Sequence, residues 1–142
     1  MIYLFTGQPG AGKTTLGKLL LKFLKSPVHI DGDDVRRILK NTDYSEAGRR
    51  KNIEWANSVA FFLNETGHDV ILTMVSPYKD MRDDLKAKTN VVEIYVHTDD
   101  VRGRESFFAE DYDPPTEKFI DMNTTGLCAF DAYHKLTGYI FI

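Results

Sequence analysis

Short apolar runs alternate with longer amphipathic segments along the chain. Such alternation is typical of βαβ units, in which helices cover a parallel sheet. The apolar runs predict strands at residues 2–6, 28–30, 70–74, 91–97 and 119–122. The longer segments predict helices at residues 13–24, 34–40, 45–65, 79–87, 101–109 and 126–136. We therefore expect an α/β fold of three layers with a parallel sheet of about five strands.

The segment at residues 45–65 has the clearest helical periodicity. Ile53, Ala56 and Ala60 recur at helical spacing, which places one apolar stripe against the sheet. Ser45 is the expected N-cap, because its hydroxyl can accept a hydrogen bond from a free amide of the first turn.

The composition is that of a globular protein, since 42% of the residues are hydrophobic and 27% are charged. At 142 residues the chain fits one compact core, so we expect a single domain over residues 1–142. The one cysteine, Cys128, has apolar neighbours, and we expect it to be a buried structural thiol.

The net charge of −3 argues against broad binding to nucleic acid or to anionic lipid, which would require a basic surface. No apolar run approaches the ~20 residues that span a bilayer, and no basic leader precedes the first apolar run. We therefore expect a cytoplasmic protein that has neither a membrane nor a nucleic acid as partner.

A glycine-rich motif lies between the first predicted strand and the first predicted helix. The segment Gly7-Gln8-Pro9-Gly10-Ala11-Gly12-Lys13-Thr14 satisfies the phosphate-loop pattern G-x-x-x-x-G-K-[ST] in the required structural context. Its glycines allow backbone amides to converge on phosphate oxygens, and the helix N-terminus adds a positive field. The motif predicts a P-loop fold that binds the β- and γ-phosphates of ATP or GTP together with Mg²⁺.

Three side chains after the glycines have specific roles in such a loop. Lys13 would span the β- and γ-phosphates, the Thr14 hydroxyl would ligate Mg²⁺, and Thr15 is a further candidate contact to phosphate. We expect that Lys13 is not buried when no nucleotide is bound. Lys13→Ala should therefore abolish phosphoryl transfer and leave the fold largely intact.

A carboxylate for the metal is expected elsewhere, because no aspartate ends the third predicted strand. Asp31, Asp33 and Asp34 follow the second predicted strand, and open α/β sheets bind ligands beyond the carboxyl ends of their strands. These residues are candidates for the metal and acceptor site. The alternative is that Asp33 or Asp34 caps the next helix and Arg36 is solvated.

Further polar groups are expected at the same edge of the sheet. Arg49 and Asn52 lie three residues apart and so project from one face of their predicted helix. Ser76 follows the third predicted strand. An acceptor that carries anionic groups needs arginines, and its neutral hydroxyl needs a carboxylate within reach.

The order of these segments resembles the adenylylsulfate kinase family of P-loop kinases, which phosphorylate adenosine 5′-phosphosulfate on its ribose 3′-hydroxyl. Gly7 to Thr15 resembles the family's phosphate loop. Asp31 to Arg36 resembles its D-G-D-N-V-R segment, with Asp34 in place of the asparagine. The remaining matches are Tyr44-Ser45 with Arg49 and Asn52, Val75-Ser76-Pro77-Tyr78-Lys79 with Arg82, and Asp113-Pro114-Pro115.

The resemblance implies a role for each matched residue. Lys13, Asp33 and Asp31 would be catalytic, with Asp33 orienting or deprotonating the acceptor hydroxyl and joining Thr14 as a Mg²⁺ ligand. Arg36, Arg49 and Asn52 would hold the phosphosulfate and adenosine, and Tyr44 would stack on the adenine. Val75 and Ser76 would border the same pocket.

The resemblance fails between Val96 and Asp113, where the family carries a longer, basic lid. We expect a short lid at about residues 98–117. Its candidate ligand contacts are Arg102, Arg104 and Phe108, and a solvated helix face is the equal alternative for each arginine. A short lid would weaken the exclusion of water.

The first hypothesis is therefore an ATP-dependent adenylylsulfate kinase that acts in sulfate assimilation and uses Mg²⁺. The second is a P-loop kinase for another nucleotide, a sugar or a polynucleotide hydroxyl. The third is a non-catalytic ATP-binding module. A GTPase is disfavoured because no N-K-x-D motif occurs. The apolar residues 139–142 fit a last edge strand, a homodimer surface or a clipped end.

Overall fold

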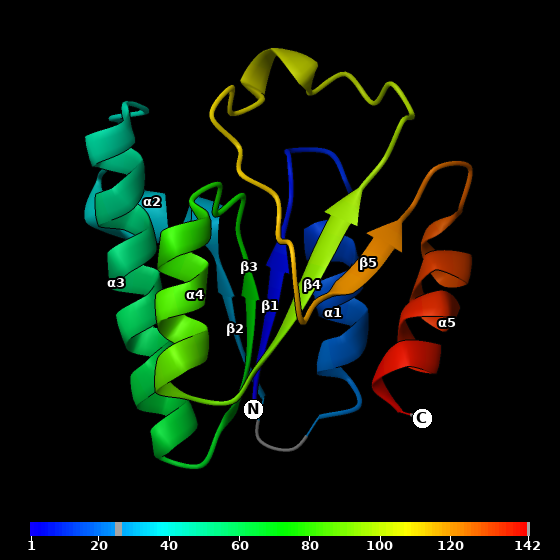
Figure 1. Cartoon of the computed structure of the whole chain (residues 1–142), viewed down its shortest axis with the longest axis horizontal. Helices are drawn as coiled ribbons and strands as arrows, with labels where there is room; N and C mark the ends of the chain where they lie inside the picture. The colour runs from blue at the N-terminus through cyan, green and yellow to red at the C-terminus, as the bar shows by residue number, and fades with distance from the viewer. Residues whose placement is uncertain (25–26, 142) are drawn as a thin grey trace.

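The structure, a computed structural model, describes residues 1–24 and 27–141 and contains a five-stranded parallel sheet (Figure 1). The strands are β1 (Ile2–Thr6), β2 (Pro27–Asp31), β3 (Asp69–Thr73), β4 (Val91–His97) and β5 (Ile120–Asn123). Their order across the sheet is β2-β3-β1-β4-β5, and neighbouring strands are parallel. The five predicted strands are confirmed, with their ends within one residue of the prediction.

Helices cover both faces of this sheet. They are α1 (Lys13–Leu21), α2 (Gly32–Leu39), α3 (Glu46–Glu65), α4 (Lys79–Lys88) and α5 (Ala129–Ile140). Figure 1 shows α2, α3 and α4 on one side of the sheet and α1 and α5 on the other. The prediction of a three-layer α/β fold is therefore confirmed.

The core consists of two apolar clusters, one on each face of the sheet. The first joins Ile2 and Leu4 of β1 to the stripe of α3 that contains Ile53, Ala56 and Ala60. The second joins Phe5 of β1 to α1 and α5. Because the central strand is buried on both faces, its sequence is continuously apolar rather than alternating.

The N-cap of α3 agrees with the prediction, because the Ser45 hydroxyl accepts a hydrogen bond from the Gly48 amide at 3.3 Å. The cap of α2 differs from the alternative that named Asp33 or Asp34. Asp31 caps this helix, since its side chain accepts from the Asp33 amide at 3.1 Å. That alternative is wrong.

The prediction of a helix at residues 101–109 is wrong. This stretch contains only the short 3₁₀ turn η1 (Glu105–Phe107). Gly103 takes a positive φ of 80°, and the Glu105 side chain accepts from the Arg102 amide, which replaces helical hydrogen bonds. Phe107 is 65% exposed, so no apolar face buries the segment against the sheet.

The C-terminal predictions also need correction. Helix α5 extends to Ile140, so an edge strand is wrong for Tyr139 and Ile140, and Ile142 lies outside the described residues. Cys128 is exposed at the N-cap of α5, so the expectation of a buried thiol is wrong.

Within the described residues, no helix is long and apolar enough to cross a membrane.

A glycine sets the distance between α1 and the sheet. A Cβ added at Gly17 would lie 2.8 Å from the Thr73 methyl and 3.0 Å from the Ile71 Cγ2 atom, both on β3. Thr73 and Ile71 are buried, so neither methyl can move into solvent.

We therefore expect Gly17→Ala to lower the free energy of unfolding by about 1–3 kcal/mol through overpacking. Gly138→Ala in α5 is the matched control, because a Cβ there meets nothing within 4 Å. This control should raise the free energy of unfolding by about 0.5–1 kcal/mol through helix propensity. Urea unfolding of both variants checks the pair, and equal effects would contradict the close packing of α1.

Candidate active site

The phosphate loop connects β1 to α1, as its motif predicts. Gly12 forms the N-cap of α1 at φ 107°, a left-handed conformation that favours glycine. At Gly7, a Cβ would lie 2.1 Å from the Val96 carbonyl oxygen of β4. The loop therefore depends on glycine both for its turn and for its close approach to the neighbouring strand.

The Lys13 side chain is buried, contrary to expectation, with 8% of its surface exposed. Its ammonium donates hydrogen bonds to the carbonyl oxygens of Gly7 at 2.8 Å and Gln8 at 2.9 Å. Burial lowers the pKa of Lys13 to about 8, Asp31 and Asp33 oppose this shift, and Arg104 adds to it. The loop thus encloses its own lysine.

Two aspartates lie beside the start of α1. The Thr14 hydroxyl donates to the Asp31 carboxylate at 3.0 Å, and Asp33 lines the same cleft. Mg²⁺ prefers oxygen ligands and is commonly bound through one or two carboxylates together with substrate phosphates. A hydroxyl next to two carboxylates fits that requirement. Among the described residues, no group of three His, Cys, Asp or Glu side chains forms a metal cage.

One cleft of about 790 Å³ lies beyond the carboxyl ends of the strands. Its wall includes all the candidate acceptor-side residues: Asp33, Arg36, Tyr44, Arg49, Asn52, Val75 and Ser76. It also includes most of the phosphate loop: Pro9, Gly10, Gly12, Lys13, Thr14 and Thr15. Donor and acceptor groups predicted from separate segments therefore share one cavity.

Two buried polar atoms on this wall have no hydrogen-bond partner among the described residues. They are Asn52 Oδ1 and Ser76 Oγ, whose side chains are 4% and 2% exposed. A buried polar group without a partner is costly, so such atoms point to contacts that a ligand completes.

The two arginines of the candidate acceptor side, Arg36 and Arg49, contact other groups of the protein. Arg36 donates to the carbonyl oxygens of Asn41 and Asp43, and its guanidinium lies 4.0 Å from the centre of the Tyr44 ring. Arg49 forms an ion pair of 3.1 Å with Asp111. Tyr44 itself is 64% exposed and so presents a free ring face. The Asp111 contact was not predicted, because it joins segments 62 residues apart.

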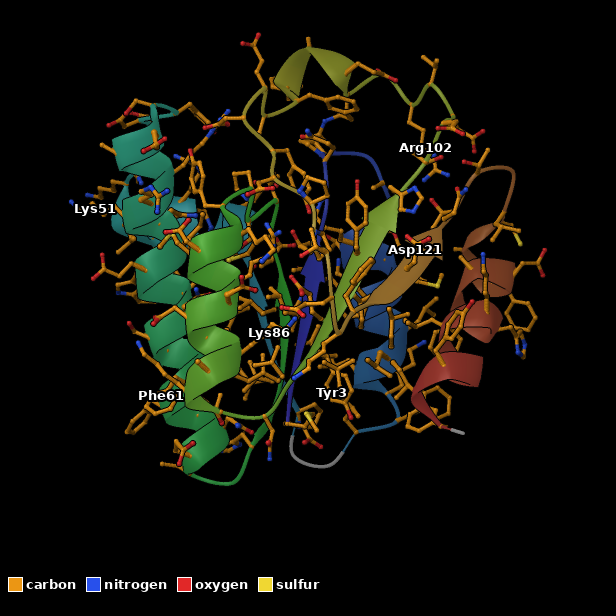
Figure 2. The ribbon with its side chains drawn as sticks, viewed as in Figure 1. Tyr3, Lys51, Phe61, Lys86, Arg102 and Asp121 are labelled. Carbon is orange, nitrogen blue, oxygen red and sulfur yellow. The ribbon has the colours of Figure 1, made fainter. Side chains whose placement is uncertain are left out.

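The lid leaves the end of β4 and arches above the carboxyl ends of the strands (Figure 1). Arg102 lies at its foot, near the ends of β4 and β5 (Figure 2), and donates to the carbonyl oxygens of Gly10, Ala11 and Thr124. The alternative of a solvated helix face is therefore wrong for Arg102. Arg104 and Phe108 line the cleft.

A second contact closes the lid onto the phosphate loop. The Gln8 side-chain amide donates to the Ala109 carbonyl at 2.8 Å, and its oxygen accepts from the Ala109 amide at 2.9 Å. Gln8 occupies a position that the phosphate-loop motif leaves open, so no sequence signal revealed this clasp.

Comparison with known proteins extends these observations. The family model described as adenylylsulphate kinase matches residues 1–106. Cytidine diphosphoramidate kinase of Campylobacter jejuni is 38% identical over 100 residues, which cover 66% of this chain and 58% of that protein. An adenylyl-sulfate kinase of Rippkaea orientalis is 32% identical over 143 residues, covering 84% and 79%.

The fold also matches solved structures. The Mycobacterium tuberculosis APS kinase in complex with AMPPNP and APS aligns with a TM-score of 0.79 at 19% identity, covering 99% of this chain and 97% of that one. Among the curated relatives, three matches cover only 58%, 46% and 50% of the relative's length. The chain thus spans about half the length of several proteins that it matches.

The burial of Lys13 predicts a pH dependence of stability. Its pKa of about 8 lies below the ordinary 10.5, so the unfolded chain binds more protons between these values. Stability should therefore rise with pH in this window. Relative to Lys13→Met, we expect the wild-type free energy of unfolding to increase by about 2 kcal/mol between about pH 7 and 9.5.

Urea unfolding at both pH values checks this expectation. Lys18→Met is the control, because Lys18 is an exposed residue of the same helix. A pH-independent difference between wild type and Lys13→Met would contradict the buried ammonium.

Proposed function

The chain belongs to the adenylylsulphate kinase family, and we propose that it transfers the γ-phosphoryl group of ATP to the ribose 3′-hydroxyl of adenosine 5′-phosphosulfate. The observation that carries the proposal is the shared cleft. Lys13 and Thr14 of the phosphate loop face the same cavity as Asp33, Arg36 and Arg49. A module that only binds ATP needs no acceptor-side carboxylate or arginines.

On the donor side, the amides of the phosphate loop and the ammonium of Lys13 would hold the β- and γ-phosphates. Lys13 must first leave the carbonyl oxygens of Gly7 and Gln8. Thr14, with Asp33 or Asp31, would hold Mg²⁺, which neutralises charge on the phosphates when bound. Arg102 ties the lid to the loop and so helps to exclude water.

On the acceptor side, Asp33 would accept the proton of the attacking hydroxyl or orient that hydroxyl toward the phosphorus. Arg36 and Arg49 would pair with the anionic groups of the acceptor, and a planar guanidinium suits phosphate and sulfate oxygens. Asn52 Oδ1 and Ser76 Oγ have no hydrogen-bond partner in the part of the chain that the structure describes, and they are available to polar groups of the nucleotide.

A second candidate acceptor is cytidine diphosphoramidate. The observation that favours it is the 38% identity to the Campylobacter jejuni kinase of that name. Both candidate acceptors are nucleotides with a substituted phosphate, so the same arginines would serve either one. The base and the terminal group distinguish the two acceptors.

The test is ADP release from MgATP with each acceptor in turn, followed by identification of the phosphorylated product. We expect acceptor-dependent ADP release that Lys13→Ala abolishes. Asp33→Asn should lower kcat by roughly 10²–10⁴-fold, the usual contribution of a general base.

Asp34→Asn is the matched control, because Asp34 is an exposed neighbour that pairs with Arg37 and does not line the cleft. It should retain activity within about twofold, since surface ion pairs contribute little. ADP release that neither acceptor stimulates, with MgATP still bound, would reject the proposed reaction.

A further inference from the structure

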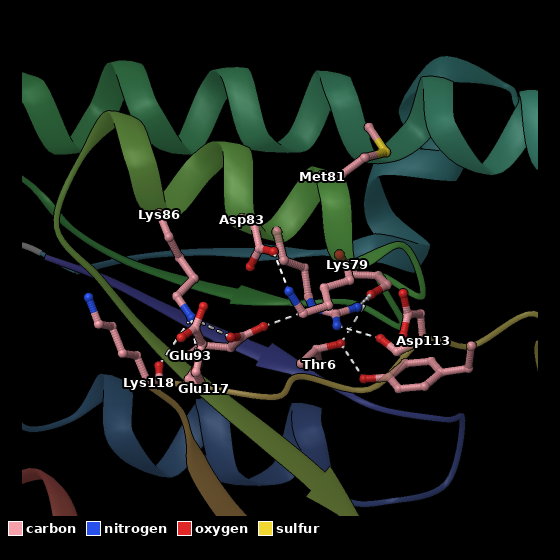
Figure 3. Close-up of polar contacts among 12 residues, drawn as sticks. Thr6, Lys79, Met81, Asp83, Lys86, Glu93, Asp113, Glu117 and Lys118 are labelled. Atoms are coloured by element: carbon pink, nitrogen blue, oxygen red, sulfur yellow. Dashed lines mark hydrogen bonds and ion pairs between the residues drawn. The ribbon is translucent and has the colours of Figure 1, made fainter.

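A buried charge cluster lies beside the cleft, between α4 and β4 (Figure 3). Arg82 is fully buried and pairs with Glu93 at 2.8 Å, and Lys86 pairs with the other oxygen of Glu93 at 2.7 Å. None of these three side chains lines the cleft. The proposed reaction therefore assigns them no direct task.

Arg82 uses the rest of its guanidinium to hold two loops. Nη1 donates to the Ser76 carbonyl oxygen at 2.6 Å, and Nη2 donates to the Asp113 carbonyl oxygen. The Asp113 amide in turn donates to the Pro77 carbonyl oxygen at 2.8 Å. The segment after β3 and the returning limb of the lid are thus joined at one side chain.

The first of these loops carries an acceptor-side residue in an unfavourable conformation. Ser76 has a φ of 43°, in the left-handed region that residues with a Cβ rarely adopt. Its carbonyl oxygen accepts from Arg82 and also from the Thr6 hydroxyl at 3.2 Å. These bonds maintain the conformation that leaves Ser76 Oγ on the cleft wall without a protein partner.

The second loop carries the partner of an acceptor-side arginine. Tyr112 lies over the Arg82 guanidinium at 5.6 Å, and its hydroxyl lies 2.7 Å from Thr6 Oγ1. Burial raises the pKa of Tyr112, so this hydroxyl keeps its proton. Asp111, the preceding residue, pairs with Arg49 of the cleft.

We propose that Arg82 is a positioning residue for the phosphoryl acceptor: one buried guanidinium sets Ser76 and the Asp111–Asp113 limb of the lid relative to each other. The inference rests on the proposed function and deepens it. The three bonds diverge from one planar group to a carboxylate and two carbonyl oxygens. A lysine could keep the charge beside Glu93 but could not reproduce this fork.

The test compares Arg82→Lys and Arg82→Met with Lys86→Met. Lys86→Met is the matched control. It removes the second cation beside Glu93 and the Lys86 bonds to the Glu117 and Lys118 carbonyl oxygens, but it leaves the bonds of Arg82 to Ser76 and Asp113 in place. For each variant, kcat, the KM for the acceptor, the KM for ATP and the urea unfolding midpoint are measured. Amide hydrogen exchange is followed along the chain.

We expect Arg82→Lys to keep most of the unfolding midpoint and to raise the KM for the acceptor roughly tenfold or more, with the KM for ATP changed less than about twofold. Lys86→Met should lower the unfolding midpoint and leave the KM for the acceptor within about twofold. Exchange in Arg82→Lys should accelerate at Val75, Ser76 and residues 111–113 alone.

The proposal is overturned if Arg82→Lys has wild-type kinetics, or if the KM for the acceptor simply follows the unfolding midpoint in all variants. If Arg82→Met folds, its KM for the acceptor and its unfolding midpoint add a second pair of values to this comparison. If the wild-type protein uses neither acceptor, the proposed function fails separately. The exchange data then still decide whether Arg82 sets the two segments, because uniform acceleration, or none, overturns the inference.

Discussion

The carboxyl ends of five parallel strands meet at one edge of the sheet, and the groups of the cleft leave the sheet at that edge. The phosphate loop follows β1, the aspartates follow β2 and Ser76 follows β3. Because β3 separates β1 from β2, the predicted donor and acceptor residues are one strand apart. A change of strand order would disperse these residues without altering any of them.

The lid is short, yet it is fastened at several points along its length. Arg102 holds its start to the phosphate loop, Gln8 holds its middle through Ala109, and Asp111 pairs with Arg49 on α3. These contacts reach both the donor and the acceptor side. Several contacts along its length therefore hold this lid to both sides of the cleft.

Local signals in the sequence predicted the strands and the phosphate loop. A strand buried on both faces is a run of consecutive apolar residues, and the phosphate loop is a motif of consecutive residues. The placement of Asp33, Arg36, Arg49 and Asn52 around one cleft followed from the strand ends and from helical spacing. Contacts across long separations were not predictable in this way.

Three errors show the limit of local signals. The burial of Lys13 depends on carbonyl oxygens of its own loop that only the folded turn aims inward. The N-cap of α2 is the Asp31 side chain, whose orientation the sequence does not reveal. From the sequence alone, a neighbouring aspartate could equally have capped this helix. At residues 101–109, the pattern suggested a helix, but only a 3₁₀ turn forms and Phe107 is 65% exposed.

The backbone bond from Asp113 to Pro77 and the clasp of Gln8 on Ala109 fasten the lid on its returning side. Gly103 lies in an open part of the lid, because a Cβ added there would have nothing within 4 Å. Insertions or deletions there would lengthen or shorten the lid while these two attachments stayed in place. In evolutionary terms, the lid can then change length at this position without loss of its attachments at Ala109 and Asp113.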